Sequence, residues 1–449
     1  MEDLSTKTIC FVDNGLFTGF ARKIAPAFAR AFYYMPWQSA FPKSRQLVVG
    51  EGFPEIERVK SIIRYRPDGA ETSARAWTRF KDQVDLWAFL DVFHADLQWE
   101  LIQEGRRVWG ARDAEELELY RWEARQVWKR LGLQVLPAEL VVGMPRLREH
   151  LKQAQDKWVK QSFTRGDWET FHHQDYQQSE RRLEQMEYDL GPIKEDYEFI
   201  VENTMPDTVE FGYDGAAVDH TFLYPALLAP EVKGLGMVAR LVLSPAELPP
   251  ALRAVNEKLA PEFGRLGYRG NFSSEVRYGM DQKGVLLDPC CRLGSPSNEL
   301  LQEMLGNWPR TMWDGAVGIV TPPKALWKFG AVVMAYAEDS GQNYQELFYP
   351  KSLDAAVKLR NPLRMGARNF AVPQGAPQNL AGIVGVGNTL LDAIAQAAQR
   401  ARQVKGDRID LALPAFWDAV AILRKAEKFG TRFGGVLPSA EELRKALAG

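Results

Sequence analysis

Apolar and polar positions alternate with two different periods along the chain, and this predicts a mixture of strands and helices. Short apolar runs end at turn residues in KTICFVDNG (7–15), RQLVVGEG (45–52) and VDLWAFLDV (84–92), as is typical of buried strands. FARKIAPAFARAFYY, which follows the first run, has helical spacing. A strand, a turn and a helix in succession are typical of an open α/β sheet. We therefore expect an N-terminal α/β domain over residues 1–113.

The centre of the chain begins with the pattern of an amphipathic helix at 114–132, stopped by Gly132. Extended runs follow in DKWVKQSF, YEFIVEN and TVEFGYDG. Farther on, NFSSEVRYGMDQKGVLLDPCCR has two extended runs around a polar turn that contains Gly279 and Gly284. This pattern predicts a β-hairpin.

Two prolines, Pro322 and Pro323, mark a boundary after this hairpin, and further strands and helices follow. We expect a central domain over residues 114–321, with a mobile subdomain at about 145–215. A C-terminal α+β domain is expected over 322–449.

The predicted hairpin carries the first candidate chemistry. Glu275 lies on one strand and Asp288 on the other, so the turn can bring both carboxylates to one face. Two close carboxylates repel each other unless a cation lies between them, and Mg²⁺ prefers such oxygen ligands. Arg292 follows four residues later and can bind a phosphate or a carboxylate with two hydrogen bonds. Alternatively, Glu275 is a solvated strand residue and Asp288 opens a turn before Pro289.

A lysine at the end of a strand gives a second candidate. Lys160 ends the apolar run of DKWVKQSF and is followed by a loop with Ser162, Arg165 and Gly166. A point charge beside free backbone N–H groups can bind phosphate, although a surface lysine before a loop is more common. Glu202 ends the next strand, and Glu210 lies on the strand after it.

Composition argues against several classes of protein: nucleic-acid-binding, membrane-spanning and disulfide-stabilised. The 449 residues carry a net charge of −2, which provides no basic field for nucleic acid, and the longest apolar runs are too short to span a membrane. The three cysteines, Cys10, Cys290 and Cys291, cannot form a disulfide framework. We expect a cytoplasmic protein. The sequence indicates no particular oligomeric state.

The order of these features resembles the ATP-grasp superfamily, and within it most closely the phosphoribosylamine–glycine ligase family. RRVWGARDAEELELYRWEARQVWKRLGLQVLP, PEVKGLGMVAR, LLDPCCRLGSP and NLAGIVGVGNTLLDAIAQAAQRA are similar to segments of that family. The resemblance implies an ATP-grasp fold, α/β and α+β in class, with an N-terminal open α/β domain and a C-terminal α+β domain. It also implies ATP and Mg²⁺ as cofactors, with Mn²⁺ as a substitute, and a small carboxylate and an amine as substrates.

The resemblance assigns roles to individual residues. Glu275 and Asp288 become the metal ligands. Arg292 would steady the acyl phosphate, and Lys233 would face the reacting phosphate. The nucleotide would be held by Arg121, Lys160, Ser162, Arg165, Gly166, Glu202, Asn203, Thr204 and Glu210. Of these, Lys160 takes the α/β-phosphates, Glu202 the adenine amine and Glu210 the ribose.

The chain also departs from the family pattern. Asp288 replaces the usual glutamate, and Cys290 replaces a metal-binding asparagine, which exchanges a hard oxygen ligand for a soft sulfur. Adjacent cysteines can suggest zinc, but no further Cys or His is close in sequence. Two functions therefore stay open: an ATP-dependent carboxylate–amine ligase that acts through an acyl phosphate, and a nucleotide-binding protein without ligase turnover. A dehydrogenase is disfavoured because no G-x-G-x-x-G follows the first strand.

Overall fold

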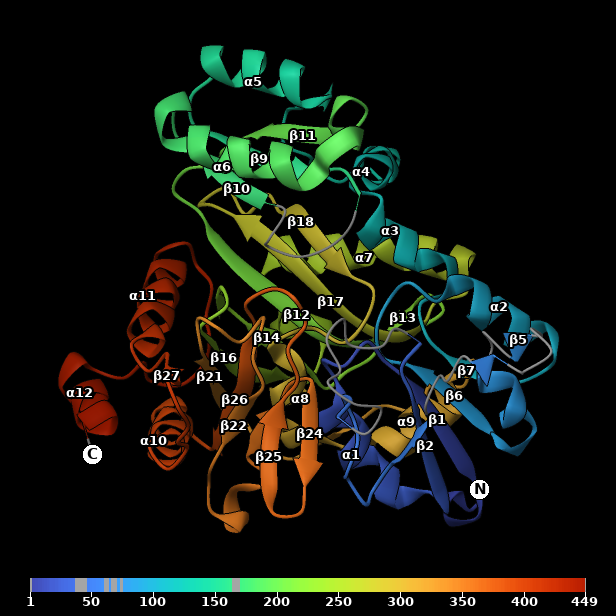
Figure 1. The fold of residues 1–449 in the computed structure, drawn as a ribbon. Helices are drawn as coiled ribbons and strands as arrows, with labels where there is room; N and C mark the ends of the chain where they lie inside the picture. The colour runs from blue at the N-terminus through green and yellow to red at the C-terminus, as the bar shows by residue number, and fades with distance from the viewer. Residues whose placement is uncertain are drawn as a thin grey trace.

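The chain folds around three principal sheets, which Figure 1 shows as a lower right, a central and an upper layer. The computed structural model describes residues 2–36, 47–59, 64–65, 71–72, 76–163 and 170–448. Within these residues, no helix is both long and apolar enough to cross a membrane.

The N-terminal sheet is parallel and has the strand order β3-β2-β1-β6-β7. Its strands are β1 (Thr8–Val12), β2 (Arg30–Tyr34), β3 (Glu57–Val59), β6 (Leu86–Phe89) and β7 (Arg107–Trp109). The helices α1 (Thr18–Ile24) and α2 (Ala95–Gln103) connect strands of this sheet. The expected open α/β arrangement is confirmed, and its strand order reverses between β1 and β6, where such sheets commonly bind ligands.

One strand prediction in this region is wrong. Residues 47–52 of the expected strand form turns, and 45–46 lie outside the described residues. The second strand is instead β2, inside the segment with helical spacing. The helix α1 ends at Ile24, and Pro26 follows in a short 3₁₀ turn, because proline cannot continue the hydrogen-bond pattern of a helix.

The small upper sheet is antiparallel, with the order β10-β9-β11-β8. Its elements are β8 (Ala138–Val142), α5 (Met144–Gln153), β9 (Lys157–Gln161), β10 (Thr170–His173), α6 (Tyr176–Leu190) and β11 (Glu198–Asn203). Val159, Phe199 and Val201 pack against α5 and α6 in one apolar cluster. Since side chains alternate along a strand, Lys160 and Glu202 lie on the other face, toward the large sheet.

The large central sheet has the order β18-β17-β12-β14-β16-β21-β26-β23, and all of its pairs are antiparallel. These strands are β12 (Val209–Val218), β14 (Ala226–Ala229), β16 (Gly236–Val242), β17 (Arg269–Tyr278), β18 (Val285–Cys290), β21 (Phe329–Tyr336), β23 (Val357–Leu359) and β26 (Asn379–Gly387). Three short strands pair with them: β13 (Thr221–Phe222), β15 (Glu231–Val232) and β27 (Asp410–Leu411). The sheet therefore runs across the expected boundary at 321/322, and that boundary stays a prediction.

Small strand groups complete the described sheets. They are β4 (Arg64–Tyr65) with β5 (Glu71–Thr72), β19 (Leu305–Gly306) with β20 (Lys324–Ala325), and β22 (Gln345–Leu347), β25 (Arg368–Ala371) and β24 (Pro362–Met365).

Helices join and cover the sheets. The remaining described α-helices are α3 (Glu116–Leu119), α4 (Arg121–Arg130), α7 (Pro250–Leu266), α8 (Ser297–Met304), α9 (Trp308–Gly315), α10 (Leu390–Ala401), α11 (Ala415–Lys428) and α12 (Ala440–Ala448). The predicted helix at 114–132 is broken at Tyr120, between α3 and α4. Phe263 of α7 packs edge-on against Phe272 of β17 with ring centroids 4.8 Å apart. This contact lies on the face of the sheet opposite Glu275, because successive side chains alternate.

Candidate functional site

A cavity of about 530 Å³ lies between the small sheet and the β12-β17-β18 edge of the large sheet. The small sheet contributes Lys160 of β9 and Glu202 of β11, and the hairpin contributes Glu275 and Asp288. The structure therefore brings together the lysine and the two acids that the sequence singled out. The volume is in the range of small-molecule and cofactor sites.

Lys160 is nearly buried at the end of β9, and its Nζ atom lies 3.0 Å from Oε1 of Glu202. Burial alone would lower the pKa of Lys160, but the carboxylates of Asp288 and Glu202 raise it above its ordinary value. The side chain therefore keeps its positive charge inside the cavity and can face an anionic ligand.

The two acids of the hairpin lie directly opposite each other. Glu275 of β17 and Asp288 of β18 are register partners, next to a bulge between Glu275 and Val276. Burial and neighbouring carboxylates raise the pKa of Glu275 to about 8, although Lys233 opposes this shift. Burial would also raise the pKa of Asp288, but Lys160 and Arg121 lower it below its usual range.

Lys233 occupies the space among three carboxylates. Its Nζ atom lies 2.6 Å from Oε2 of Glu275, 3.3 Å from Oε1 of Glu210 and 3.7 Å from Oε2 of Glu231. Glu210 is also paired with Arg277 at 2.7 Å. The ammonium group thus neutralises a cluster that would otherwise attract another cation.

The oxygen ligands of the hairpin suit Mg²⁺. Glu275 and Asp288 supply two hard carboxylate ligands, which suits a Mg²⁺ ion that takes its other ligands from phosphates and water. The described residues contain no group of three or more His, Cys, Asp or Glu side chains arranged to hold a metal by themselves. Burial raises the pKa of Cys290 well above its ordinary value, so its thiol stays protonated and is a poor ligand for a hard ion. The residues fit an ion that arrives with a nucleotide.

Several residues that line the cavity or contact its lining residues were not predicted from the sequence. Arg125 is paired with Oε2 of Glu202 at 2.7 Å, and it follows Arg121 by one helical turn. Trp158 precedes Lys160 by two residues, on the same face of β9. Helical and strand periodicity, applied to the residues already chosen, would have found both. Periodicity could not have found Glu231, because its strand β15 is only two residues long.

Other predicted residues lie around the cavity rather than on its wall. Nε of Arg121 is 3.7 Å from Oδ1 of Asp288, and Ser162 is buried, with its backbone paired to Glu198 and Arg121. Exposed Asn203 accepts a hydrogen bond from Lys157, and Thr204 donates one to Asp156.

Arg165 and Gly166 lie outside the described residues.

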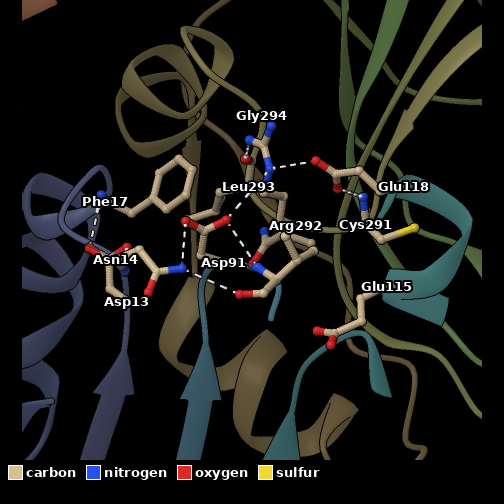
Figure 2. Close-up of polar contacts among 12 residues, drawn as sticks. Asp13, Asn14, Phe17, Asp91, Glu115, Glu118, Cys291, Arg292, Leu293 and Gly294 are labelled. Atoms are coloured by element: carbon tan, nitrogen blue, oxygen red, sulfur yellow. Dashed lines mark hydrogen bonds and ion pairs between the residues drawn. The ribbon is translucent and has the colours of Figure 1, made fainter. Parts of the chain in front are cut away.

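Arg292 is not brought to the cavity. Figure 2 shows its guanidinium between two carboxylates, with Nε 2.9 Å from Oε1 of Glu118 and 3.6 Å from Oδ1 of Asp91. The other oxygen of Glu118 accepts from the backbone N–H of Cys291 at 2.7 Å. Arg292 therefore ties the end of β18 to α3 and to the carboxyl end of β6. Its role toward an acyl phosphate stays a prediction.

Asp13, at the carboxyl end of β1, is fully buried near this cluster. It accepts hydrogen bonds from the backbone N–H groups of Asn14 and Phe17 and from the hydroxyl of Tyr33. Burial, together with the charge of Asp91, raises the pKa of Asp13 to about 7.

This shift predicts a pH-dependent stability. Between about pH 4 and pH 7 the folded chain holds a proton on Asp13 that the unfolded chain releases, so the contribution of Asp13 to the free energy of unfolding should fall as pH rises, by at most about 1.4 kcal/mol per unit. Denaturant unfolding at several pH values should therefore show a steeper fall for the wild type than for Asp13→Asn. The exposed Asp96→Asn is the control and should leave the slope unchanged. Identical slopes for the wild type and Asp13→Asn would contradict the assignment.

A four-stranded antiparallel sheet covers the acid-bearing edge of a larger antiparallel sheet over a ligand-sized cavity. Solved ATP-grasp enzymes superpose on nearly the whole length of the chain, which therefore has the ATP-grasp fold that the resemblance of its sequence implied. No protein-family model matches the chain, and no curated protein matches it by sequence.

Three solved structures illustrate the likeness. Phosphoribosylamine–glycine ligase from Thermotoga maritima has a TM-score of 0.64 and 13% identity, covering 90% of this chain and 98% of that one. The biotin carboxylase domain of 2-oxoglutarate carboxylase from Hydrogenobacter thermophilus, solved with MgADP, ADP and bicarbonate, has a TM-score of 0.65 and 11% identity, covering 98% of each chain. N5-carboxyaminoimidazole ribonucleotide synthetase from Thermotoga maritima has a TM-score of 0.58 and 13% identity, covering 89% of this chain and 99% of that one.

Proposed function

We propose that the protein is an ATP-dependent carboxylate–amine ligase that forms a C–N bond through an acyl phosphate. One observation carries this proposal: Lys160, Glu275 and Asp288 come from two different sheets and line one cavity of about 530 Å³. The similarity to solved ligases and to a carboxylase complexed with MgADP supports it.

In the proposed reaction, an oxygen of the substrate carboxylate attacks the γ-phosphorus of ATP, and ADP leaves. The nitrogen of the unprotonated amine then attacks the acyl carbon, inorganic phosphate leaves with the bonding electrons, and the proton that the nitrogen loses passes to the departing phosphate. Activation is needed because phosphate is a far better leaving group than hydroxide. Lys160 and Arg121 would bind the phosphates and offset their charge.

Glu275 and Asp288 would hold Mg²⁺, which when bound offsets charge on the transferring phosphoryl group. To free Glu275 for this task, the ammonium group of Lys233 would move about its flexible side chain toward the reacting phosphate.

The adenine would lie beside Glu202, Asn203 and Thr204, with Glu210 near the ribose. Both oxygens of Glu202 are engaged by Lys160 and Arg125, so an adenine contact would require one of these pairs to rearrange. Ser162 would contribute to phosphate binding, and the phosphate contacts predicted for Arg165 and Gly166 concern residues outside the described part of the chain.

The test is release of phosphate from ATP by the purified protein, over pools of carboxylates and amines. We expect turnover with Mg²⁺ only when a suitable acid and amine are both present, and a new amide product that mass spectrometry detects. Turnover that is independent of the amine would contradict ligation.

The alternative function is nucleotide binding without turnover. Two observations favour it: the ammonium group of Lys233 already lies among Glu210, Glu231 and Glu275, and Cys290 stands where the family has a metal-binding asparagine. Calorimetric titration with ATP and Mg²⁺ separates the two functions. Binding without phosphate release over all pools would favour this alternative.

A further inference from the structure

A second, smaller cavity lies beside the main one, on the same face of the large sheet. The strand register pairs Gly212 with Glu275 and Asp214 with Ser273, and Cys290 of β18 is the partner of Ser273 on its other side. Residues two apart on a strand point to the same face of the sheet. The register pair of Asp214 and Ser273 therefore lies on the same face as Glu275, two residues farther along the strands. The small cavity lies between Asp214 and Glu275 on this face.

The small cavity is about 20 Å³ in volume and shares Glu210, Glu231 and Glu275 with the main cavity. Such a volume holds about one water-sized group. It is therefore too small for a nucleotide or an acyl substrate, but large enough for a single nitrogen with its protons.

Asp214 is the unusual residue of this cavity. Its side chain is only 2% exposed, and Oδ1 accepts a hydrogen bond from Oγ of Ser273 at 2.6 Å. Oδ2 is buried and has no hydrogen-bond partner among the described residues. A Cβ atom at Gly212 would lie 3.2 Å from Oδ2, and one at Gly294 would lie 2.8 Å from Oδ1. The two glycines thus leave the carboxylate open toward the cavity that all three residues line.

Asp214 differs from the other carboxylates of this cavity because no ion pair between described residues engages it. The lining of the cavity includes the four carboxylates of Glu210, Asp214, Glu231 and Glu275 and contains no basic side chain. Lys233 and Arg277 reach the glutamates from the main cavity. Asp214, in contrast, has hydroxyl groups as its nearest partners; burial raises its pKa, and the hydroxyl groups and the more distant charge of Lys233 only oppose this shift. A buried carboxylate without a close cation is costly.

We propose that the small cavity binds a primary ammonium group, the head of the amine substrate. This inference rests on the proposed ligase function for its role, but the binding itself can be measured separately. An ammonium group has several N–H donors to match Oδ2 of Asp214 and neighbouring oxygens. A metal ion fits less well, because the described residues contain no three-ligand cluster.

Because the small cavity shares residues with the main cavity, an amine bound in it would lie near the reacting groups. Since Glu275 lines both cavities, a nitrogen beside Asp214 would lie next to the metal end of the proposed nucleotide cavity, where the acyl phosphate would form. The ammonium group would first pass a proton to the carboxylate of Asp214, so that its nitrogen gains the lone pair needed for attack. The small volume restricts the acceptor to ammonia or an unhindered primary amine and excludes secondary and bulkier amines.

Binding of small cations to the full chain, in the presence of MgADP, tests this inference. We expect methylammonium chloride to raise the melting temperature and to give a calorimetric titration, whereas tetramethylammonium chloride at equal ionic strength should do neither. Asp214→Asn should weaken methylammonium binding at least about tenfold, since it removes one charge-assisted hydrogen bond. The exposed hairpin variant Asp281→Asn should bind like the wild type. A parallel titration with ammonium chloride distinguishes the two possible acceptors. Binding of ammonium without methylammonium indicates ammonia as the acceptor, and binding of both ammonium and methylammonium indicates a primary amine.

A second variant tests the same cavity independently, in case Asp214→Asn does not fold. Gly212→Ala keeps all charges but places a methyl group beside Oδ2, so it should also abolish methylammonium binding. Unchanged binding in Gly212→Ala and Asp214→Asn, or equal binding of tetramethylammonium, would overturn the inference. Its failure is distinguishable from that of the ligase proposal: methylammonium binding without phosphate release refutes ligation alone, and turnover with bulky secondary amines refutes the small cavity alone.

Discussion

Lys160→Ala should weaken ATP binding by roughly a hundredfold or more and abolish phosphate release. The substitution removes a buried ammonium group that lies 3.0 Å from Glu202 and whose charge also acts on Asp288. Charge-assisted hydrogen bonds contribute about 1.5–3 kcal/mol each, and the two acids would then repel the incoming phosphates. Calorimetric titration with ATP and Mg²⁺ measures the loss of affinity.

The matched control for this variant is Lys152→Ala, which removes an exposed lysine from α5 in the same layer. It should bind ATP like the wild type. Lys160→Arg keeps the charge and should retain part of the affinity, and circular dichroism verifies that each variant is folded. If Lys160→Ala bound ATP as tightly as Lys152→Ala, the placement of the phosphates beside β9 would be wrong.

The second large effect is expected at the hairpin. Asp288→Asn should reduce phosphate release by roughly a hundredfold, and should raise the Mg²⁺ concentration needed for half-maximal turnover. The amide keeps the shape of the side chain but lacks the negative charge that a Mg²⁺ site requires. Measuring turnover across a Mg²⁺ and a Mn²⁺ titration checks both effects.

Two further variants make this test specific. Asp288→Glu should retain turnover, because it restores the longer acid of the family that the chain resembles. Asp281→Asn removes a carboxylate from the exposed turn of the same hairpin and should have no effect. Full activity of Asp288→Asn would contradict a metal role for this residue.

The hairpin shows how far local patterns lead. Alternation of apolar residues and the turn glycines predicted both strands, and the structure confirms them as β17 and β18. That Glu275 lies directly opposite Asp288 depends also on the bulge after Glu275, which no local pattern indicated. The same alternation would have found Trp158 beside Lys160, and helical spacing would have found Arg125 beside Arg121.

The N-terminal region shows where local patterns mislead. β2 lies in a segment with helical spacing, and only Pro26 indicated that the helix ends before it. Short apolar runs in a parallel sheet are buried on both faces and show no alternation, so tertiary pairing between β1 and β2 decides their conformation.

The sequence by itself determined the lysine-bearing strand and the acid-bearing hairpin, because each depends on periodicity and turn residues within a short segment. The ATP-grasp fold was implied by the resemblance of most of the chain to a known superfamily, not by local patterns. Only the tertiary structure decided which charges meet. Arg292 is paired with Asp91 and Glu118, Lys233 lies among three carboxylates, and Asp214 faces a cavity whose lining contains no basic side chain. These contacts join residues far apart in the chain, and electrostatic interactions depend on distance in space and on burial, not on separation in sequence.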